Sequence, residues 1–315
     1  MINSSNIKIG PGYKTWSGGT FRFNDGGIRT KFVVGSREVS AEEFGRFDTV
    51  DTDRRIVTTG KLWSGYENLS LVLPGVAFNP VIGGQLYGIA NLAGVINGQD
   101  GSRLTTMNEQ ITKLANMELA VEKDLWSADI EFTSLLKAGM TPDQAGAYYT
   151  YTTGNAYNAP VFNKSNFRAP ILNAGWNGTL SNNGTSFGAF VFRKGLQLEW
   201  KWDLDWEPCY VDGYGTLDAI INGFEVSAKG TPIGVLEADA AASLIPAQAL
   251  GTLRSGNAGD LTLTFGSNTI IGKQMYVASN DGFAWARKTN RISDLTLRST
   301  VPFSAGVPIA RASAN

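Results

Sequence analysis

The segment from Leu196 to Glu207 alternates strictly between apolar and polar residues. The even positions carry leucine and tryptophan, including Trp200, Trp202 and Trp206, and the odd positions carry glutamine, lysine and acidic residues. This period of two is the pattern of a β-strand with one buried face and one solvated face. At about 3.3 Å per residue it predicts a strand of roughly 40 Å, about twice the usual length, whose aromatic face requires a second sheet to cover it.

The acidic residues of this strand, Asp203, Asp205 and Glu207, share the opposite face. Side chains on opposite faces of one strand cannot meet, so these carboxylates cannot act on a sugar stacked against the tryptophans. A calcium ion could bridge them, but the glycine-turned loop of a dedicated calcium site is missing. We expect this row to be solvated or to face an assembly interface.

The chain of 315 residues contains no histidine. This removes the commonest general base, the usual partner of a serine or cysteine nucleophile, and the commonest metal ligand. Two-carboxylate glycoside chemistry remains possible in principle, but the sequence shows no pair of acids marked for it. A phosphate loop and a dinucleotide-binding glycine pattern are also missing. We therefore expect no catalytic activity, no cofactor and no bound metal ion.

Lysine and arginine together number 27, and aspartate and glutamate 28, which gives a net charge of −1. This balance argues against a protein that grips nucleic acid by neutralising phosphates. The single cysteine, Cys209, excludes an internal disulfide and is expected in a buried strand. The N-terminus lacks the features of a secretory signal, so synthesis in the cytoplasm is expected. Residues 68–99 carry no charge, but prolines and glycines interrupt them, so we predict a subunit contact and no membrane segment.

The two halves of the chain resemble each other. Similar strand-like segments follow in the same order at a nearly constant spacing, which is the mark of a repeated unit. We therefore predict two homologous units, residues 1–158 and 159–315. The matched pairs include Ile28 and Leu196, Thr30 and Leu198, Phe32 and Trp200, Gly45 and Gly213, Gly60 and Gly230, and Asp129 and Asp294.

Each unit is expected to be mainly β, with one short flanking α-helix. In the first unit Ser64 and Glu67 have the spacing of a capping box, and Pro74 follows the apolar run. In the second unit an alanine-rich segment ends at Pro246. Residues 105–120 fit either a helix or a strand.

Several segments together resemble the tail tube (major tail) proteins of long-tailed bacteriophages. They are the opening strand IKIGPGYKTWSGG, the loop REVSAEEFGRFDT, the strand RRIVTTGKLW, the helix SGYENLSLVLPG and the closing segment ADIEFTSLLKAGMTPDQAGAYYT. The resemblance implies small β-sandwich or barrel units that assemble into stacked rings through which DNA passes without specific binding. Such proteins are normally single-unit and hexameric, so a duplicated chain would form a trimeric ring with pseudo-sixfold symmetry.

The resemblance also implies a location in the virion tail, synthesis in the host bacterial cytoplasm, and other tail proteins as partners. We expect the loops at 36–53 and 204–222 to stack one ring on the next, and the long strand to provide an oligomer or lumen face. The predicted stacking residues are Glu42, Glu43, Asp48, Asp212 and Tyr214, and the long-strand residues are Trp200, Trp202, Trp206, Asp203, Asp205 and Glu207.

Two other functions remain open at this point. One is a different ring of the same virion, such as a baseplate or tail-terminator protein. The other is a carbohydrate-binding or glycosidase-like β-sandwich, which the 11% aromatic content permits. Convergence of two carboxylates about 5 to 10 Å apart, beside exposed aromatic rings, would favour the last.

Overall fold

The computed structural model describes a mainly β chain, as the sequence predicts. Its strands pair antiparallel in one 17-stranded sheet and in a separate two-stranded sheet. The described residues are 12–65, 68–73, 82–87, 92–98, 101–120, 125–154, 176–182, 185–192, 197–230, 232–233, 251, 259–265, 268–280, 295–299 and 309–313. The boundary predicted at residues 158 and 159 and the helix predicted before Pro246 lie outside them.

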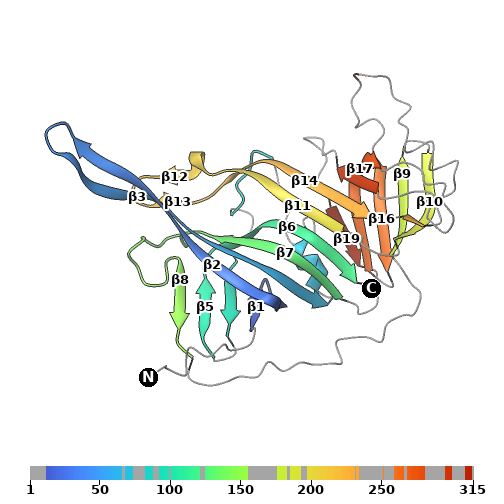
Figure 1. Cartoon of the computed structure of the whole chain (residues 1–315), viewed down its shortest axis with the longest axis horizontal. Helices are drawn as coiled ribbons and strands as arrows, with labels where there is room; N and C mark the ends of the chain where they lie inside the picture. The colour runs from blue at the N-terminus through green and yellow to red at the C-terminus, as the bar shows by residue number, and fades with distance from the viewer. Residues whose placement is uncertain are drawn as a thin grey trace.

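The elements before residue 153 are led by a very long hairpin, β2 and β3, whose outer part extends away from the rest of the molecule (Figure 1). They are β1 (Tyr13–Trp16), β2 (Gly19–Ala41), β3 (Gly45–Gly65), α1 (Leu69–Val72), β4 (Gly94–Asn97), β5 (Arg103–Thr106), β6 (Glu109–Ala120), β7 (Leu125–Ser134) and β8 (Tyr149–Thr152).

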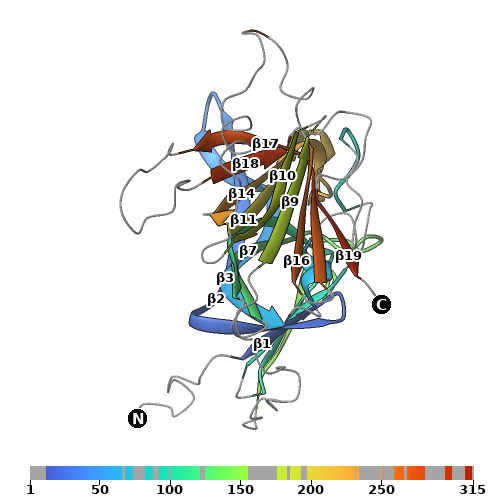
Figure 2. The ribbon, with the colours of Figure 1, turned by 90° about the vertical axis from the view of Figure 1, so that its right-hand side faces the viewer.

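The later elements place β9, β10 and β16 side by side, as the rotated view shows (Figure 2). They are β9 (Trp176–Asn182), β10 (Thr185–Phe192), β11 (Gln197–Asp205), the 3-10 turn η5 (Glu207–Cys209), β12 (Tyr210–Val211), β13 (Gly215–Thr216), β14 (Ile220–Gly230), β15 (Pro232–Ile233), β16 (Gly259–Phe265), β17 (Asn268–Asn280), β18 (Leu295–Ser299) and β19 (Ile309–Ser313).

The predicted loop at 36–53 is wrong, because these residues continue the hairpin. From the pair Ile28–Gly60 to the pair Ala41–Gly45, the ladder between β2 and β3 is interrupted only by β-bulges. Only residues 42–44 form a turn, closed by the Phe44 N–H donating to the Ala41 carbonyl at 3.1 Å. A two-stranded ribbon with both faces in solvent needs no buried face, so its polar composition looks like that of a loop.

The alternating strand is confirmed in part. In β11 Leu198, Trp200 and Trp202 are buried, while the polar residues between them are exposed. The strand ends at Asp205, because a bulge follows Asp203 and the chain then turns into η5. The predicted continuation to Glu207 is therefore wrong, and the longest strands of the described chain are β2 and β3.

The predicted capping box is also wrong. Ser64 lies in β3, and its hydroxyl donates to the Thr20 carbonyl at 3.0 Å, while α1 begins at Leu69. This α1, the α-helix of the described part, is far too short to cross a membrane. Residues 109–120 of the undecided segment form the strand β6.

Cys209 is half-buried at the end of η5 and not within a strand, which corrects the prediction made for it. Burial, with the nearby carboxylates of Asp218 and Asp205 adding to it, raises the pKa of its thiol. The thiol is therefore poorly ionised at neutral pH, which makes it a weak nucleophile.

The strand pairings before residue 153 recur in the same chain order after residue 176. The pairings of β1 with β2 and β4 correspond to those of β9 with β10 and β16. The pairings of β3 with β2 and β7 correspond to those of β14 with β11 and β18, so the long β2 has its counterpart in β10 and β11 together. The first part of β17 pairs with β16 and β19, as β5 pairs with β4 and β8. The second part pairs with β18, as β6 pairs with β7. The two parts of β17 therefore correspond to β5 and β6.

The registers of these pairings also correspond. Phe32 pairs with Ile56 as Trp200 pairs with Val226. Val226 follows Ile56 in the chain by the same number of residues as the turn pair Val211–Gly215 follows the turn pair Ala41–Gly45. Gly45 therefore corresponds to Gly215, and its sequence match with Gly213 is wrong. Gly45 and Gly215 have φ of +65° and +78°, a conformation that favours glycine.

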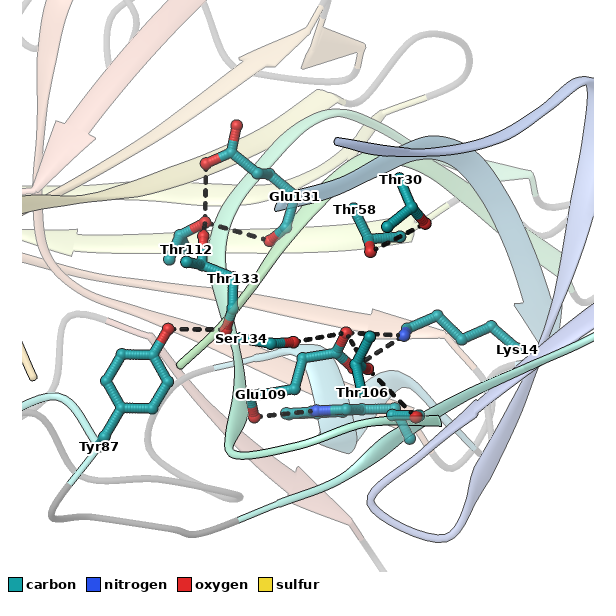
Figure 3. Close-up of polar contacts among 12 residues, drawn as sticks. Lys14, Thr30, Thr58, Tyr87, Thr106, Glu109, Thr112, Glu131, Thr133 and Ser134 are labelled. Atoms are coloured by element: carbon teal, nitrogen blue, oxygen red, sulfur yellow. Dashed lines mark hydrogen bonds and ion pairs between the residues drawn. The ribbon is translucent and has the colours of Figure 1, made fainter. Parts of the chain in front are cut away.

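A fully buried ion pair joins β1 to β6. The Lys14 ammonium lies 2.7 Å and 3.0 Å from the two carboxylate oxygens of Glu109, which also accepts from the hydroxyls of Thr106 and Ser134 (Figure 3). Gly94 leaves room for this pair, since a Cβ there would stand 1.7 Å from Glu109 Oε2. At the position that corresponds to Glu109, β17 carries the buried Met275.

Removing one partner of this pair should destabilise the chain strongly. We expect Glu109→Gln to lower the free energy of unfolding by on the order of 3–5 kcal/mol, because it leaves a buried ammonium without its counter-charge. The double variant Lys14→Met with Glu109→Met should lose less free energy of unfolding, since it buries no charge. It places an apolar side chain where β17 has the buried Met275. Chemical denaturation followed by tryptophan fluorescence checks both values, and equal losses for the two variants would contradict this account.

Candidate assembly surface

The two halves of the sheet meet where β11 lies between β6 and β14. β11 pairs antiparallel with β14 along its whole length and with β6 from Gln197 to Lys201. The sheet thereby forms a run of eight strands in the order β2, β3, β7, β6, β11, β14, β18 and β17. We call the pairing of β6 with β11 the internal joint.

The tryptophans of β11 hold the internal joint from inside the chain. Trp200 Nε1 donates to the carbonyl of Val72 in α1, and Trp202 Nε1 donates to the carbonyl of Ile111 in β6, both at 3.0 Å. Their relative exposures are 1% and 6%. The expectation that Trp200 and Trp202 form an oligomer or lumen face is therefore wrong, because the same chain supplies their cover.

A segment of the first half also covers the second half directly. We call residues 82–87 the clasp. It runs beside the start of β14 and belongs to the uncharged stretch predicted at a contact between subunits. The clasp bonds are Gly83 N–H to Ile221 O at 2.7 Å, Ile221 N–H to Gly84 O at 3.0 Å, Leu86 N–H to Ala219 O at 2.9 Å, and Tyr87 N–H to Asp218 Oδ1 at 2.9 Å.

Tyr87 anchors the end of the clasp in the core. Its phenol is buried and donates to the Thr133 carbonyl at 2.6 Å (Figure 3). Burial, reinforced by the carboxylates of Glu109 and Asp218, raises the pKa of Tyr87 well above its ordinary value of about 10. The folded chain therefore holds this proton after an unfolded chain has lost it.

The corresponding surface on β2 and β3 is uncovered. Phe32 and Val34 occupy the positions of Trp200 and Trp202, yet they are 50% and 57% exposed. Val50, which corresponds to Ile220 beside the clasp, is 45% exposed. The ring centres of Phe32 and Tyr149 lie 5.0 Å apart in an edge-on contact. Trp200 and Trp202 are thus buried at the internal joint and Ile220 is half-buried, whereas the residues at the corresponding positions here are exposed.

Asp48 is a further exposed residue of the same hairpin. In the registers given above it corresponds to Asp218, and each of these carboxylates accepts the backbone N–H of the following residue at 2.7 Å. Asp218 is buried and also accepts from the clasp, whereas Asp48 is exposed. We call Phe32, Val34, Asp48 and Val50 together the open face.

Two strand edges, one on β2 and one on β17, have a partner on one side only among the described strands. From Ile28 onward β2 pairs only with β3 among the described strands, and Val277–Asn280 of β17 pair there only with β18. These two edges are the ends of the eight-strand run. They correspond to the edges of β11 and β6 that meet in the internal joint.

The other predicted site residues lie at tips and ends of strands. Glu42 and Glu43 are exposed at the turn of the β2–β3 hairpin, and Asp212 and Tyr214 are exposed at the corresponding turn between β12 and β13. The predicted loop at 204–222 thus contains η5, β12 and β13 as well as turns.

The last residues of the predicted long strand diverge in exposure. Asp203 and Glu207 are exposed, while Asp205 is half-buried and accepts from the Glu207 backbone N–H at 3.1 Å. Trp206 is half-buried, with the Arg55 guanidinium 4.7 Å from its ring centre.

Two grooves bear on the carbohydrate-enzyme alternative. One, of about 440 Å³, carries the carboxylates of Glu199 and Glu225. The other, of about 560 Å³, lies beside the clasp, between Tyr87 and Leu217. Among the described residues that line it, Asp218 is the only carboxylate, and its Oδ1 already accepts two backbone N–H groups. The described residues also contain no cluster of three or more side chains suited to a metal ion.

No protein-family model matches the chain, and no curated protein matches it. The function is therefore inferred from the open face and its covered counterpart at the internal joint. Sequence reasoning matched Phe32 with Trp200 but missed the open face. That match carried no signal of the difference, because the burial of Trp200 and the exposure of Phe32 depend on segments distant in the chain.

The buried phenol predicts a pH dependence. Above about pH 10 the unfolded chain releases the Tyr87 proton and the folded chain does not, so stability should fall as pH rises through this range. Tyr87→Phe should show a shallower fall between pH 9 and 11 than the parent chain in chemical denaturation. Tyr149→Phe, which changes an exposed tyrosine, serves as the control and should follow the parent. Parallel curves for Tyr87→Phe and the parent would contradict the assignment.

Proposed function

We propose that this chain is a duplicated β unit whose copies join into closed rings that stack into a bacteriophage tail tube. The observation that carries the proposal is the open face, because its counterpart on β11 and β14 is covered by β6, α1 and the clasp. The recurrence of the strand pairings in the two halves supports the duplication. A surface covered inside the chain and bare at its corresponding position invites the same cover from another copy.

Such a contact is head-to-tail. The open face and β2 edge lie at one end of the eight-strand run, and the β17 edge lies at the other, so different surfaces of two copies meet. Repetition of a head-to-tail contact gives a ring when the rotation closes. If chains are related as the two halves are, three copies would contribute six units, the pseudo-sixfold trimer that the resemblance implies. Their runs would then close a barrel of 24 strands, three times eight.

Ring closure also answers a physical liability of the monomer. A strand edge with unpaired backbone groups, beside exposed phenylalanine and valine, is a template for aggregation. Closing the barrel removes both edges and buries the open face. The hairpin tip, residues 42–44, would remain outside the joint, available for contact with the next ring.

The proposed tube conducts DNA and does not bind it. A net charge of −1 suits this role, because a strongly basic lumen would retain phosphates. The proposal places the protein in the virion tail, with other tail proteins and further copies of itself as partners and no enzymatic role. Other rings of the same virion and a carbohydrate-binding β-sandwich remain the competing functions, and assembly separates them.

Purified protein should form rings and tubes. Light scattering after size exclusion should give a mass three times the 33.8 kDa of one chain, or multiples of it, and negative-stain micrographs should show hollow tubes. Single rings that never stack would favour a terminator or baseplate ring. A monomer at high concentration would contradict the proposal and leave the carbohydrate-binding alternative.

Charging the open face should prevent ring formation. We expect Phe32→Asp with Val34→Asp to give folded monomers, because two carboxylates would be buried without partners in the joint. Val211→Asp charges another exposed apolar residue, outside the joint, and should still give rings. Mass and circular dichroism measure both outcomes. Rings formed by the double variant at parental concentrations would reject the open face as the contact.

Charge reversal at the hairpin tip should act at a later stage. Glu42→Lys with Glu43→Lys changes the exposed turn, so rings should form while their stacking into tubes is impaired. Electron microscopy separates rings from tubes. Tubes of normal length from this variant would reject the tip as a stacking contact.

A further inference from the structure

We infer that adjoining chains join in one defined register, in which Phe32 of β2 stands opposite Asn280 of β17 in the next copy and Val33 opposite Ser279. We further infer that Asp48 accepts a backbone N–H from that copy. The partner is a second copy of this chain, and the inference rests on the proposed ring. The proposed ring does not say which residues of two adjoining chains meet, and this register assigns them.

The position of β2 is fixed by its ladder with β3. Phe32 pairs with Ile56 as Trp200 pairs with Val226. A bulge follows Gly35–Asp53 in the first ladder and Asp203–Gly223 in the second, equally far along the ladder from these two pairs. Because the irregularities coincide, the match holds to the single residue. Phe32 and Val33 therefore stand where Trp200 and Lys201 stand.

The position of β17 is fixed in the same way by its ladder with β18. Val277 pairs with Leu297 as Ile111 pairs with Phe132, and each ladder has a bulge directly afterwards. Pairing then resumes at Ser279–Thr296 in one ladder and Lys113–Glu131 in the other. The offset of β17 from β6 is thus the same on both sides of the bulge.

A backbone feature confirms this offset independently. Asn108 and Gln274, which immediately precede the two ladders, have φ of +44° and +48°. Gln274 follows Asn108 by the same offset, and non-glycine residues rarely adopt this conformation. Asn280 and Ser279 therefore stand where Leu114 and Lys113 stand.

The internal joint supplies the register between the edges. There Trp200 is opposite Leu114 and Lys201 is opposite Lys113, in antiparallel pairing. Transferred to the edges of β2 and β17, which have no partner there among the described strands, these pairs become Phe32 opposite Asn280 and Val33 opposite Ser279. The second pair contains no like charges, so the transferred register places no charge repulsion between the two edges at this point. At the internal joint the Lys201 ammonium lies 3.0 Å from the Glu225 carboxylate, which balances its charge, whereas the Val33–Ser279 pair needs no such partner.

Asp48 extends the contact along β3. Its counterpart Asp218 accepts one N–H from its own neighbour and a second from the clasp residue Tyr87. Asp48 has the first bond, from Thr49, and its exposure leaves room for the second. A backbone N–H of the next copy would complete the same arrangement.

Engineered disulfides test the register. In a Cys209→Ser background, Val33→Cys with Ser279→Cys places the thiols at directly opposite positions of adjoining chains, within disulfide reach. The matched control, Lys31→Cys with Ser279→Cys, is displaced by two residues, about 7 Å along the strand. Mild oxidation of reduced rings, followed by non-reducing electrophoresis, should give covalent dimers and trimers from the first variant and chiefly monomers from the control.

The outcomes separate the register from the ring. Rings by light scattering with equal or stronger cross-linking of the control, or with no cross-link in either variant, would overturn the register and leave the ring standing. Failure of the Cys209→Ser parent and the unmodified chain to form rings would instead refute the proposed function. Rings with cross-linking confined to the first variant would support both.

A matched pair of substitutions tests Asp48. Asp48→Ala removes the acceptor, whereas Asp48→Asn keeps an oxygen that can accept the same N–H. We expect Asp48→Ala to raise the protein concentration needed for half-maximal ring formation by roughly tenfold, and Asp48→Asn to raise it less. If Asp48→Ala rings form at the parental concentration, Asp48 takes no part in the contact.

Discussion

The structure depends on the internal joint, where β11 inserts between β6 and β14. Backbone pairing makes the sheet continuous across the two halves, and the indole N–H groups of Trp200 and Trp202 tie the joint to α1 and β6. A tryptophan that is buried and also hydrogen-bonded contributes both apolar area and a fixed orientation. The joint therefore sets the position of one half against the other, and it creates the contrast between a covered surface and an open one.

That contrast goes with a difference in residue type between similar strands. β11 has buried tryptophans where β2 has the exposed Phe32 and Val34. The interior differs as well: Lys14 and Glu109 form a buried ion pair in one half, and Met275 fills the corresponding position in the other. A shared pairing network thus tolerates a polar and an apolar core, provided that every buried charge has its partner.

Much of the fold could be predicted from the sequence, because alternation of apolar and polar residues reports directly on a strand with one wet face. It identified most of β11, and the match of Phe32 with Trp200 agrees with the observed registers. Prediction failed where composition and backbone pairing disagree. Residues 36–53 of the β2–β3 hairpin looked like a loop because none of their described side chains is buried. Ser64 looked like a helix cap although the ladder with β7 holds it in β3.

The sequence by itself determined the mainly β class and the part of the alternating strand that forms β11, since these depend on local periodicity. Only the tertiary structure decided which apolar faces are covered. Trp200 and Phe32 have similar sequence surroundings, yet β6, α1 and the clasp lie over one, and the described residues leave the other half-exposed. Burial depends on segments distant in the chain, and no local pattern records which of two equivalent surfaces those segments reach.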